Sequence, residues 1–246
     1  MPLDLEAVIE YQGAPAAQVW DSLVGTHPTL IQPDAECDLY GTRMLASRVS
    51  AAIRRARRPD FYVEFSSDSL RYAAVGNHDL SFVEVGGWVT DDDDASNWLA
   101  PLLSMSCFVQ ARVYDKEYEF WQNASDPLQY EVRGRSLEGV KTFMNQNLNY
   151  VFVDTSTNPG RRVLREGYIE ALGHLMWLSP KFWEKVGRSI SVVESSGLCS
   201  SISKLGDVDV LRFADKPFTS SKGEEGMFQD RLRALLFPQS ELPSPG

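Results

Sequence analysis

The sequence predicts an α+β protein with a mostly antiparallel sheet and helices packed on it. Segments with strand-like patterns follow one another instead of alternating with helices, which is typical of this class. The breaks between residues 61–66, 70–76 and 80–89 are short, and short connections favour antiparallel pairing. With 246 residues, of which 43% are hydrophobic, the chain is long enough to bury a substantial core.

The elements of the N-terminal half are predicted from the spacing of apolar residues. Residues 5–11 alternate apolar and polar side chains, which indicates a strand. Residues 13–24 place bulky apolar side chains on one helical stripe, and Pro15 suits a first turn. Residues 41–58 form a second such helix, which Pro59 ends. After strands 61–66, 70–76 and 80–89, the expected elements are a helix over Ala95–Met105, a hairpin over 107–123 that turns at Asp115-Lys116, and a strand over 128–134.

The C-terminal half continues with a helix over 136–148, for which Ser136 is a candidate cap. A short helix over 179–187 has Ser179 as its cap and Pro180 at its first position. Ser221 and Glu224 have the spacing of a capping box for a last helix. The remaining elements are strands at 149–155, 173–179 and 208–213, a helix over 221–237, and a segment at 163–172 that fits neither pattern clearly.

The domain organisation follows from the absence of a linker rich in Gly, Pro or Ser. We expect one α+β domain over residues 1–237, with two closely packed lobes, 1–134 and 135–237, as an option. Residues 238–246 are rich in Pro and Ser and have little to bury, so we expect a flexible tail.

Charge and targeting patterns narrow the class of partner. The formal net charge of −10 argues against binding nucleic acid or an anionic membrane, because both need clustered Lys and Arg. It suits a protein partner with a basic surface, although many cytosolic proteins are simply acidic. We find no signal peptide and no apolar run long enough to span a bilayer. Three isolated cysteines indicate reduced thiols, so we expect a cytoplasmic protein.

No motif indicates catalysis. The P-loop, HExxH, GxSxG and GxGxxG patterns are all absent. The three histidines do not cluster, and His174 lies among apolar residues, as a core or interface histidine would. Nothing in the sequence pairs Cys199 with a base, and its reactivity stays open. We therefore expect no catalytic residue, no metal site and no cofactor.

Four consecutive aspartates, Asp91–Asp94, are the most unusual stretch. They precede a predicted helix, where one carboxylate can cap the first turn and others can offset the helix dipole. Local structure alone explains part of the run, and a purely structural role stays open. The hypothesis is a negative surface that binds a basic partner. Its residues are Asp91, Asp92, Asp93 and Asp94, with Glu84 and Asp115.

The segment "REGYIEALGHLMWLSPKFWEKVG", residues 165–187, resembles a family when it is taken with "LRFADKPF" and "RLRALLF". It is similar to bacterial immunity proteins encoded beside secreted polymorphic toxins, in particular the immunity-52-type family of type VI secretion loci. The markers are packing aromatics and turn residues, and we expect Trp177 and Trp183 to be buried.

The resemblance implies a cytoplasmic inhibitor, not an enzyme, that binds one cognate toxin and blocks its active site. Such toxins are often nucleases with basic substrate sites, and closely spaced carboxylates could then imitate a nucleic-acid backbone. Two alternatives stay open. One is a small hydrolase or transferase with an Asp/Glu-based site, and the other is an adaptor of the secretion apparatus.

Overall fold

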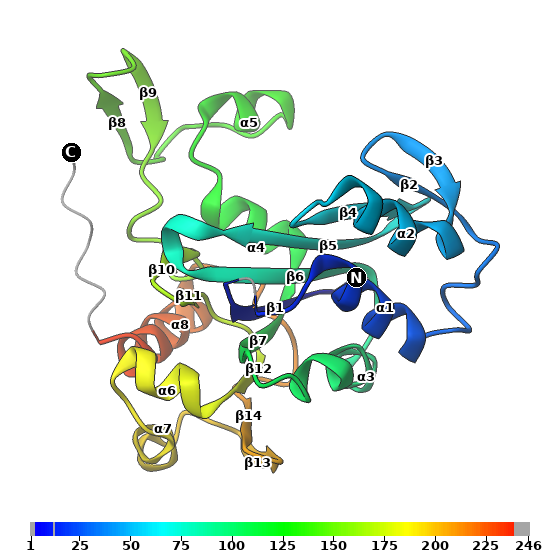
Figure 1. Ribbon diagram of the computed structural model, residues 1–246. Helices are drawn as coiled ribbons and strands as arrows, with labels where there is room; N and C mark the ends of the chain where they lie inside the picture. The colour runs from blue at the N-terminus through cyan, green and yellow to red at the C-terminus, as the bar shows by residue number, and fades with distance from the viewer. Residues whose placement is uncertain (1–2, 12, 239–246) are drawn as a thin grey trace.

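A ten-stranded antiparallel sheet organises the protein, as the computed structural model shows (Figure 1). The structure describes residues 3–11 and 13–238. The strand order is β13-β14-β12-β7-β1-β6-β5-β4-β2-β3. The strands of this sheet are β1 (Leu3–Glu10), β2 (Glu36–Leu39), β3 (Thr42–Leu45), β4 (Phe61–Phe65), β5 (Asp68–Val75), β6 (Leu80–Val89), β7 (Phe108–Asp115), β12 (Leu175–Leu178), β13 (Ser201–Leu205) and β14 (Val208–Arg212).

Helices cover both faces of the sheet, and each face has its own apolar core. Strand β1 divides its side chains between them: Leu5, Ala7 and Ile9 belong to one core and Val8 to the other. The first core includes side chains from α1 (Ala16–Thr26), α2 (Ala46–Ala56) and α3 (Asp92–Leu103). The second includes side chains from α6 (Pro180–Val186), α7 (Ile190–Ser196) and α8 (Gly223–Leu236).

The predicted fold class is confirmed. The three runs expected to form a meander are β4, β5 and β6, which pair antiparallel in sequence order. The expectation for the two tryptophans is also confirmed, because 1% of Trp177 and 8% of Trp183 is exposed. Among the described residues, no helix combines the length and the apolar character needed to cross a bilayer. Most of the expected flexible tail, from residue 239 on, lies outside the described residues.

The predicted hairpin over 107–123 is correct only in its first strand, which is β7, and the predicted strand over 128–134 is wrong. Instead of forming a hairpin turn, Asp115 ends β7 and caps helix α4 (Lys116–Asn123), with its Oδ1 accepting a 2.7 Å hydrogen bond from the backbone N–H of Tyr118. Instead of a strand, α5 (Pro127–Val132) follows, capped by Asp126. In both places an aspartate starts a helix at a point where a turn was expected. An aspartate side chain can accept hydrogen bonds from the backbone N–H groups of a turn or of a first helical turn, so the residue type does not distinguish the two.

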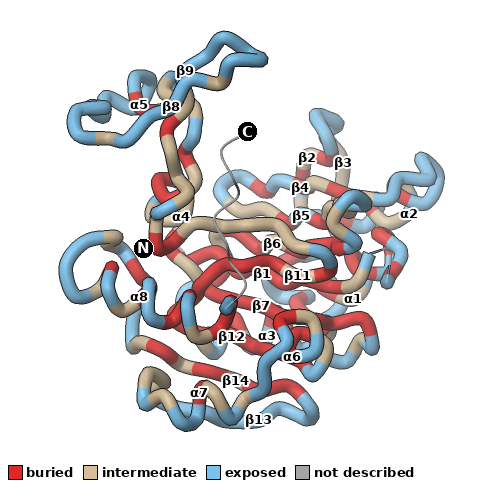
Figure 2. Tube along the Cα trace, turned by 90° about the vertical axis from the view of Figure 1, so that its left-hand side faces the viewer, coloured by how far each residue is buried: buried red, intermediate tan, exposed pale blue. Residues whose placement is uncertain are grey.

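The predicted helix over 136–148 is also wrong. Gly139 adopts a positive φ of 75°, which interrupts any helix there. The following residues form a two-stranded sheet of β8 (Thr142–Asn145) and β9 (Tyr150–Val153). Residues 127–153, which we call the arm, project from the body of the protein (Figures 1 and 2). The ambiguous segment at 163–172 forms the small hairpin of β10 (Val163–Arg165) and β11 (Tyr168–Glu170).

Candidate functional site

The four aspartates form the start of α3. Asp91 is the N-cap, and its Oδ1 accepts a 2.8 Å hydrogen bond from the backbone N–H of Asp94. Asp94 in turn accepts hydrogen bonds from the backbone N–H (3.2 Å) and the hydroxyl of Thr90. Asp91 and Asp94 are therefore bound in local contacts at the start of the helix, which is the purely structural role considered for the run.

Asp92 has a different role, because it connects α3 to distant parts of the sheet. Its carboxylate pairs with the guanidinium of Arg212 on β14 and lies 3.1 Å from Nε2 of His174. The other ring nitrogen of His174, Nδ1, lies 3.3 Å from the carbonyl oxygen of Val113. His174 is 1% exposed, so it is the satisfied buried histidine that the sequence suggested. Asp93 is exposed and makes no hydrogen bond or ion pair with any described residue.

Because of these contacts, we expect Asp92 to contribute more than Asp93 to the free energy of unfolding. Asp92→Asn should lower the free energy of unfolding by about 1 kcal/mol, because it removes a half-buried ion pair and a favourable charge at a helix N-terminus. Asp93→Asn should change it by less than about 0.5 kcal/mol. Urea denaturation of both variants measures the difference. Equal losses would show that the run acts as one capping unit. Asp93 is therefore the aspartate at which binding can be tested without loss of stability.

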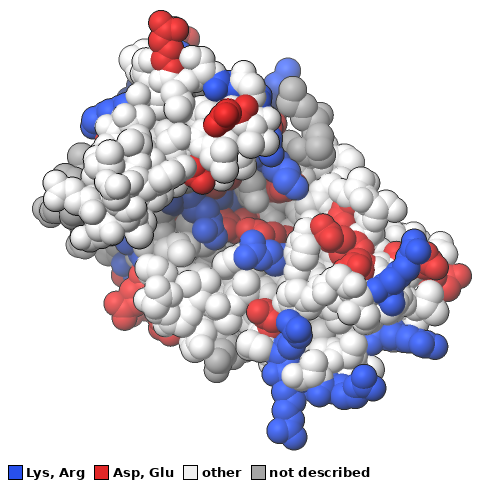
Figure 3. All heavy atoms as spheres, turned by 90° about the horizontal axis from the view of Figure 1, so that it is seen from above, with Lys and Arg blue, Asp and Glu red and all other residues white. Residues whose placement is uncertain are grey.

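Glu84 lies in another region, on the sheet face beneath the arm. Its Oε2 is 3.2 Å from Nη1 of Arg71, and both residues line a cleft between helix α4 and strands β4, β5 and β6. Figure 3 looks down on this face and shows basic and acidic side chains at the bottom of a hollow. Burial and the neighbouring carboxylate of Glu6 raise the pKa of Glu84, although Arg71 and Arg162 oppose the shift.

A buried ion-pair network lines an adjoining hollow, which shares Glu84 and Glu119 with this cleft. Arg112 donates from Nε to Glu6 (2.9 Å) and through both Nη atoms to Glu119 (2.7 and 2.9 Å). Arg162 donates to Glu6 from Nε at 2.9 Å and from Nη2 at 2.6 Å. Burial disfavours the ionised form of Glu6, but the two guanidinium groups outweigh this effect and lower its pKa to about 2. The charges of Glu6, Arg112, Glu119 and Arg162 are therefore paired with one another, which is typical of a network that stabilises the fold.

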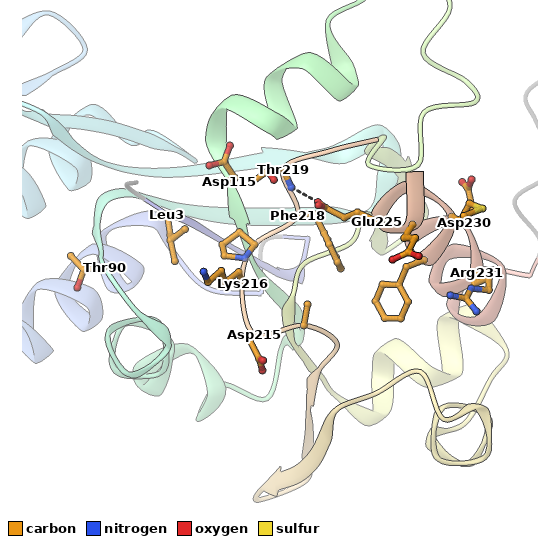
Figure 4. Close-up of a pocket in the computed structure, with 15 residues that line it drawn as sticks. Leu3, Thr90, Asp115, Asp215, Lys216, Phe218, Thr219, Glu225, Asp230 and Arg231 are labelled. Atoms are coloured by element: carbon orange, nitrogen blue, oxygen red, sulfur yellow. Dashed lines mark hydrogen bonds between the residues drawn. The ribbon is translucent and has the colours of Figure 1, made fainter. Parts of the chain in front are cut away.

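Asp115, the last residue of the hypothesis, lines a groove of about 1470 Å³ (Figure 4). The groove extends from Leu3 and Thr90 past the segment 214–219 to the exposed side of α8. Its apolar lining consists of Leu3, Ala214, Pro217, Phe218, Met227 and Phe228. The charged residues around it are Asp115, Asp215, Glu224, Glu225 and Asp230, with Lys216 and Arg231. We call this site the acidic groove.

The carboxylates of the acidic groove differ in how they are used. Asp115 caps α4, and Glu225 accepts hydrogen bonds from the backbone N–H groups of Thr219 and Ser220. The other three, Asp215, Glu224 and Asp230, are exposed and make no hydrogen bond or ion pair with the described residues. Exposed carboxylates without an ion pair therefore surround an apolar surface, an arrangement that suits a basic, partly apolar protein surface.

The sequence predicted only one of the residues that line the acidic groove, Asp115. Thr90, next to the aspartate run, and Asp115 line the acidic groove, whereas Glu84 belongs to the cleft. The expected Ser221–Glu224 capping box does not form: Lys222 occupies the N-cap position of α8, without a side-chain cap. The interleaving of acidic and aromatic residues between Asp215 and Asp230 was the available signal.

Cys199 is not among the residues that line the acidic groove. Cys199 Sγ donates to the carbonyl oxygens of Ser201 (2.9 Å) and Arg212 (3.1 Å), and burial raises the pKa of its thiol. Within residues 3–11 and 13–238, no three His, Cys, Asp or Glu side chains are placed to hold a metal ion together.

No protein-family model matches the chain, and no curated protein matches its sequence. Solved structures share its fold. Among them is the Pseudomonas aeruginosa T6SS protein PA0821, with a TM-score of 0.54 over 96% of this chain and 76% of that chain. The sequence identity is 10%, so the likeness concerns the fold.

Proposed function

We propose that this protein is a cytoplasmic immunity protein that binds and neutralises a cognate secreted toxin. The observation that carries the proposal is the acidic groove, where three unpaired carboxylates surround an apolar surface. Such a surface attracts a basic protein during encounter and offers apolar contacts once it is bound. The shared fold of a T6SS protein and the resemblance of residues 165–237 to immunity proteins support the same class. A nuclease toxin fits best, because a nuclease needs a basic substrate site.

The first experiment tests neutralisation itself. The toxin is taken from the gene next to the one that encodes this protein and is expressed in cells with and without it. Co-expression should restore growth, and the two proteins should purify as one complex. Toxicity that persists at equal expression, with no complex, would reject the proposal.

The second experiment tests the acidic groove. The triple variant Asp215→Asn/Glu224→Gln/Asp230→Asn should slow association with the toxin roughly tenfold at low salt, with a smaller effect at high salt, because it removes steering charge. Stopped-flow or surface-based kinetics measure the rate at several salt concentrations. The control is Asp34→Asn/Glu166→Gln/Glu194→Gln, which removes the same charge from exposed positions outside the groove and the arm. Equal rates for the two triple variants would exclude the groove as the steering surface.

A hydrolase or transferase is the second candidate, and one observation favours it. Glu6 and Glu84 are cross-strand neighbours that line the hollow next to the cleft, and their pKa values are shifted in opposite directions, as in many acid–base pairs. Both carboxylates already pair with arginines, which favours a structural role. Turnover of a phosphate, ester or glycoside substrate that Glu84→Gln abolishes would favour the enzyme instead.

A further inference from the structure

The end of the arm carries an unusual concentration of exposed apolar side chains. We call residues 142–153, which comprise β8, β9 and their turn, the hairpin tip. Of the fourteen large apolar residues that are exposed in the described parts of the chain, eight lie on the arm. They are Leu128, Val132, Leu137, Phe143, Met144, Leu148, Tyr150 and Val151. Exposed apolar area concentrated in this way marks a binding surface.

The hairpin tip also contains no charge. Its sequence, TFMNQNLNYVFV, lacks Asp, Glu, Lys and Arg, although the whole chain is 24% charged. The charged residues next to it in sequence, Lys141 and Asp154, pair with each other at its base at 2.7 Å, and the hydroxyl of Tyr150 donates a 2.9 Å hydrogen bond to the carboxylate of Asp126. Aromatic residues and Met with few charged residues are the usual composition of the centre of a protein–protein interface.

The hairpin tip is ordered before any partner binds. Phe143 and Phe152 stack across the two strands at 5.9 Å, and Tyr150 meets Phe152 edge-on at 5.3 Å. The Oδ1 atom of Asn145 accepts hydrogen bonds from the backbone N–H groups of Asn147 and Leu148, which fixes the turn. A preformed surface loses less conformational entropy on binding. A two-stranded sheet alone is only marginally stable in water, so a partner that covers it also stabilises it.

The charge and shape of the hairpin tip identify its occupant. A projecting surface requires a concave partner, and a surface without charged side chains pairs best with one that also lacks them. The acidic groove of a second copy does not meet this condition, because the hairpin tip offers no cation to its unpaired carboxylates. The occupant is therefore a different protein, with an apolar depression lined by uncharged groups.

We propose that the hairpin tip inserts into an uncharged, apolar depression on the toxin and anchors the complex there. This inference rests on the proposed function and assigns the arm a separate role from the acidic groove. The groove sets the rate of encounter through charge, whereas the hairpin tip limits dissociation through buried apolar contacts.

The test uses Met144→Ser/Leu148→Ser, because 54% and 65% of these residues are exposed and neither side chain makes a ring contact or a hydrogen bond. The matched control is Leu30→Ser/Leu205→Ser, at two positions that are each 51% exposed and far from the arm in sequence. The full-length variants are titrated against the purified toxin of the neighbouring gene. The hairpin variant should bind about 100-fold more weakly, mainly through faster dissociation, with an unchanged melting temperature. The control should stay within about twofold of the wild type.

Three other outcomes would overturn the inference, and they differ in what else they affect. If the wild type binds the toxin and the hairpin variant binds equally well, the anchor role is wrong while the proposed function stands. If the wild type neither binds nor neutralises the toxin, both fail together. If the wild-type protein forms a dimer in sedimentation velocity without the toxin, and the hairpin variant stays a monomer, a second copy is the occupant. Hydrogen exchange of the complex gives an independent check, since amides of residues 142–153 should become protected.

Discussion

Replacing Arg112 with methionine should lower the free energy of unfolding by about 3–5 kcal/mol, because it leaves the Glu6 carboxylate partly uncompensated in the protein interior. The Arg112 side chain is 2% exposed, as is that of Glu6. It also donates a 3.1 Å hydrogen bond to the carbonyl oxygen of Leu172, so the substitution affects two strands and a loop together. Denaturant unfolding at pH 7 measures the loss. Arg54→Met is the matched control, since its ion pair with Asp21 is exposed and should contribute at most about 1 kcal/mol.

The pH dependence of stability provides a second measurement of the same network. The pKa of Glu6 is about 2 in the folded protein, below the ordinary value of 4.5. The unfolded chain therefore binds this proton more readily, so the contribution of Glu6 is complete above pH 4.5 and is lost as pH falls toward 2. In Arg112→Met this part of the acid dependence should shrink. An unchanged acid profile would mean that Arg162 alone holds Glu6 in its ionised form.

Trp183→Ala should cost about 3–5 kcal/mol of unfolding free energy, because it leaves a large cavity in the core between the sheet and α6. The ring contacts Phe182, and its Nε1 donates a 2.8 Å hydrogen bond to Oδ2 of the buried Asp209. Lys204 Nζ lies 3.6 Å from the other oxygen of Asp209, an ionic contact that is too long for a hydrogen bond. Thermal and urea unfolding measure the loss.

Trp183→Phe separates the two contributions of this residue. It keeps most of the apolar contacts and removes only the hydrogen bond, so a loss of about 1–3 kcal/mol is expected from the carboxylate that stays buried. A loss of toxin binding in Trp183→Ala at unchanged stability would place the ring at an interface and contradict its assignment to the core.

The sequence predicted those elements whose pattern is set by local periodicity. Strands β4, β5 and β6 alternate apolar and polar residues and are separated by short turns, so both their type and their pairing followed. Around Asp115 the local signals conflict, because a helix cap and a hairpin turn use the same residue types, and only tertiary contacts decide between them.

The candidate site was less predictable, because its residues come together only through the sheet. Glu6 and Arg112 are distant in sequence, and only their adjacent positions on β1 and β7 bring them into contact. The aspartate run predicted a binding surface at the start of α3, but Asp91, Asp92 and Asp94 have partners within the protein there. The carboxylates Asp215, Glu224 and Asp230 lie far from that run along the chain, and the interleaved acidic and aromatic residues of their own segment were the local signal for them.

The position of β1 constrains the order in which the chain can fold. This strand comes first in the sequence, but it pairs with β6 on one side and β7 on the other, so that Leu5 faces Val85 and Val113. During synthesis, β1 can pair with β6 only after residues up to Val89 have left the ribosome, and with β7 only after residues up to Asp115 have done so. Contacts so distant in sequence slow folding. While β1 is unpaired, its exposed apolar side chains are a site that chaperones can bind. Without chaperones, aggregation can begin at the same strand.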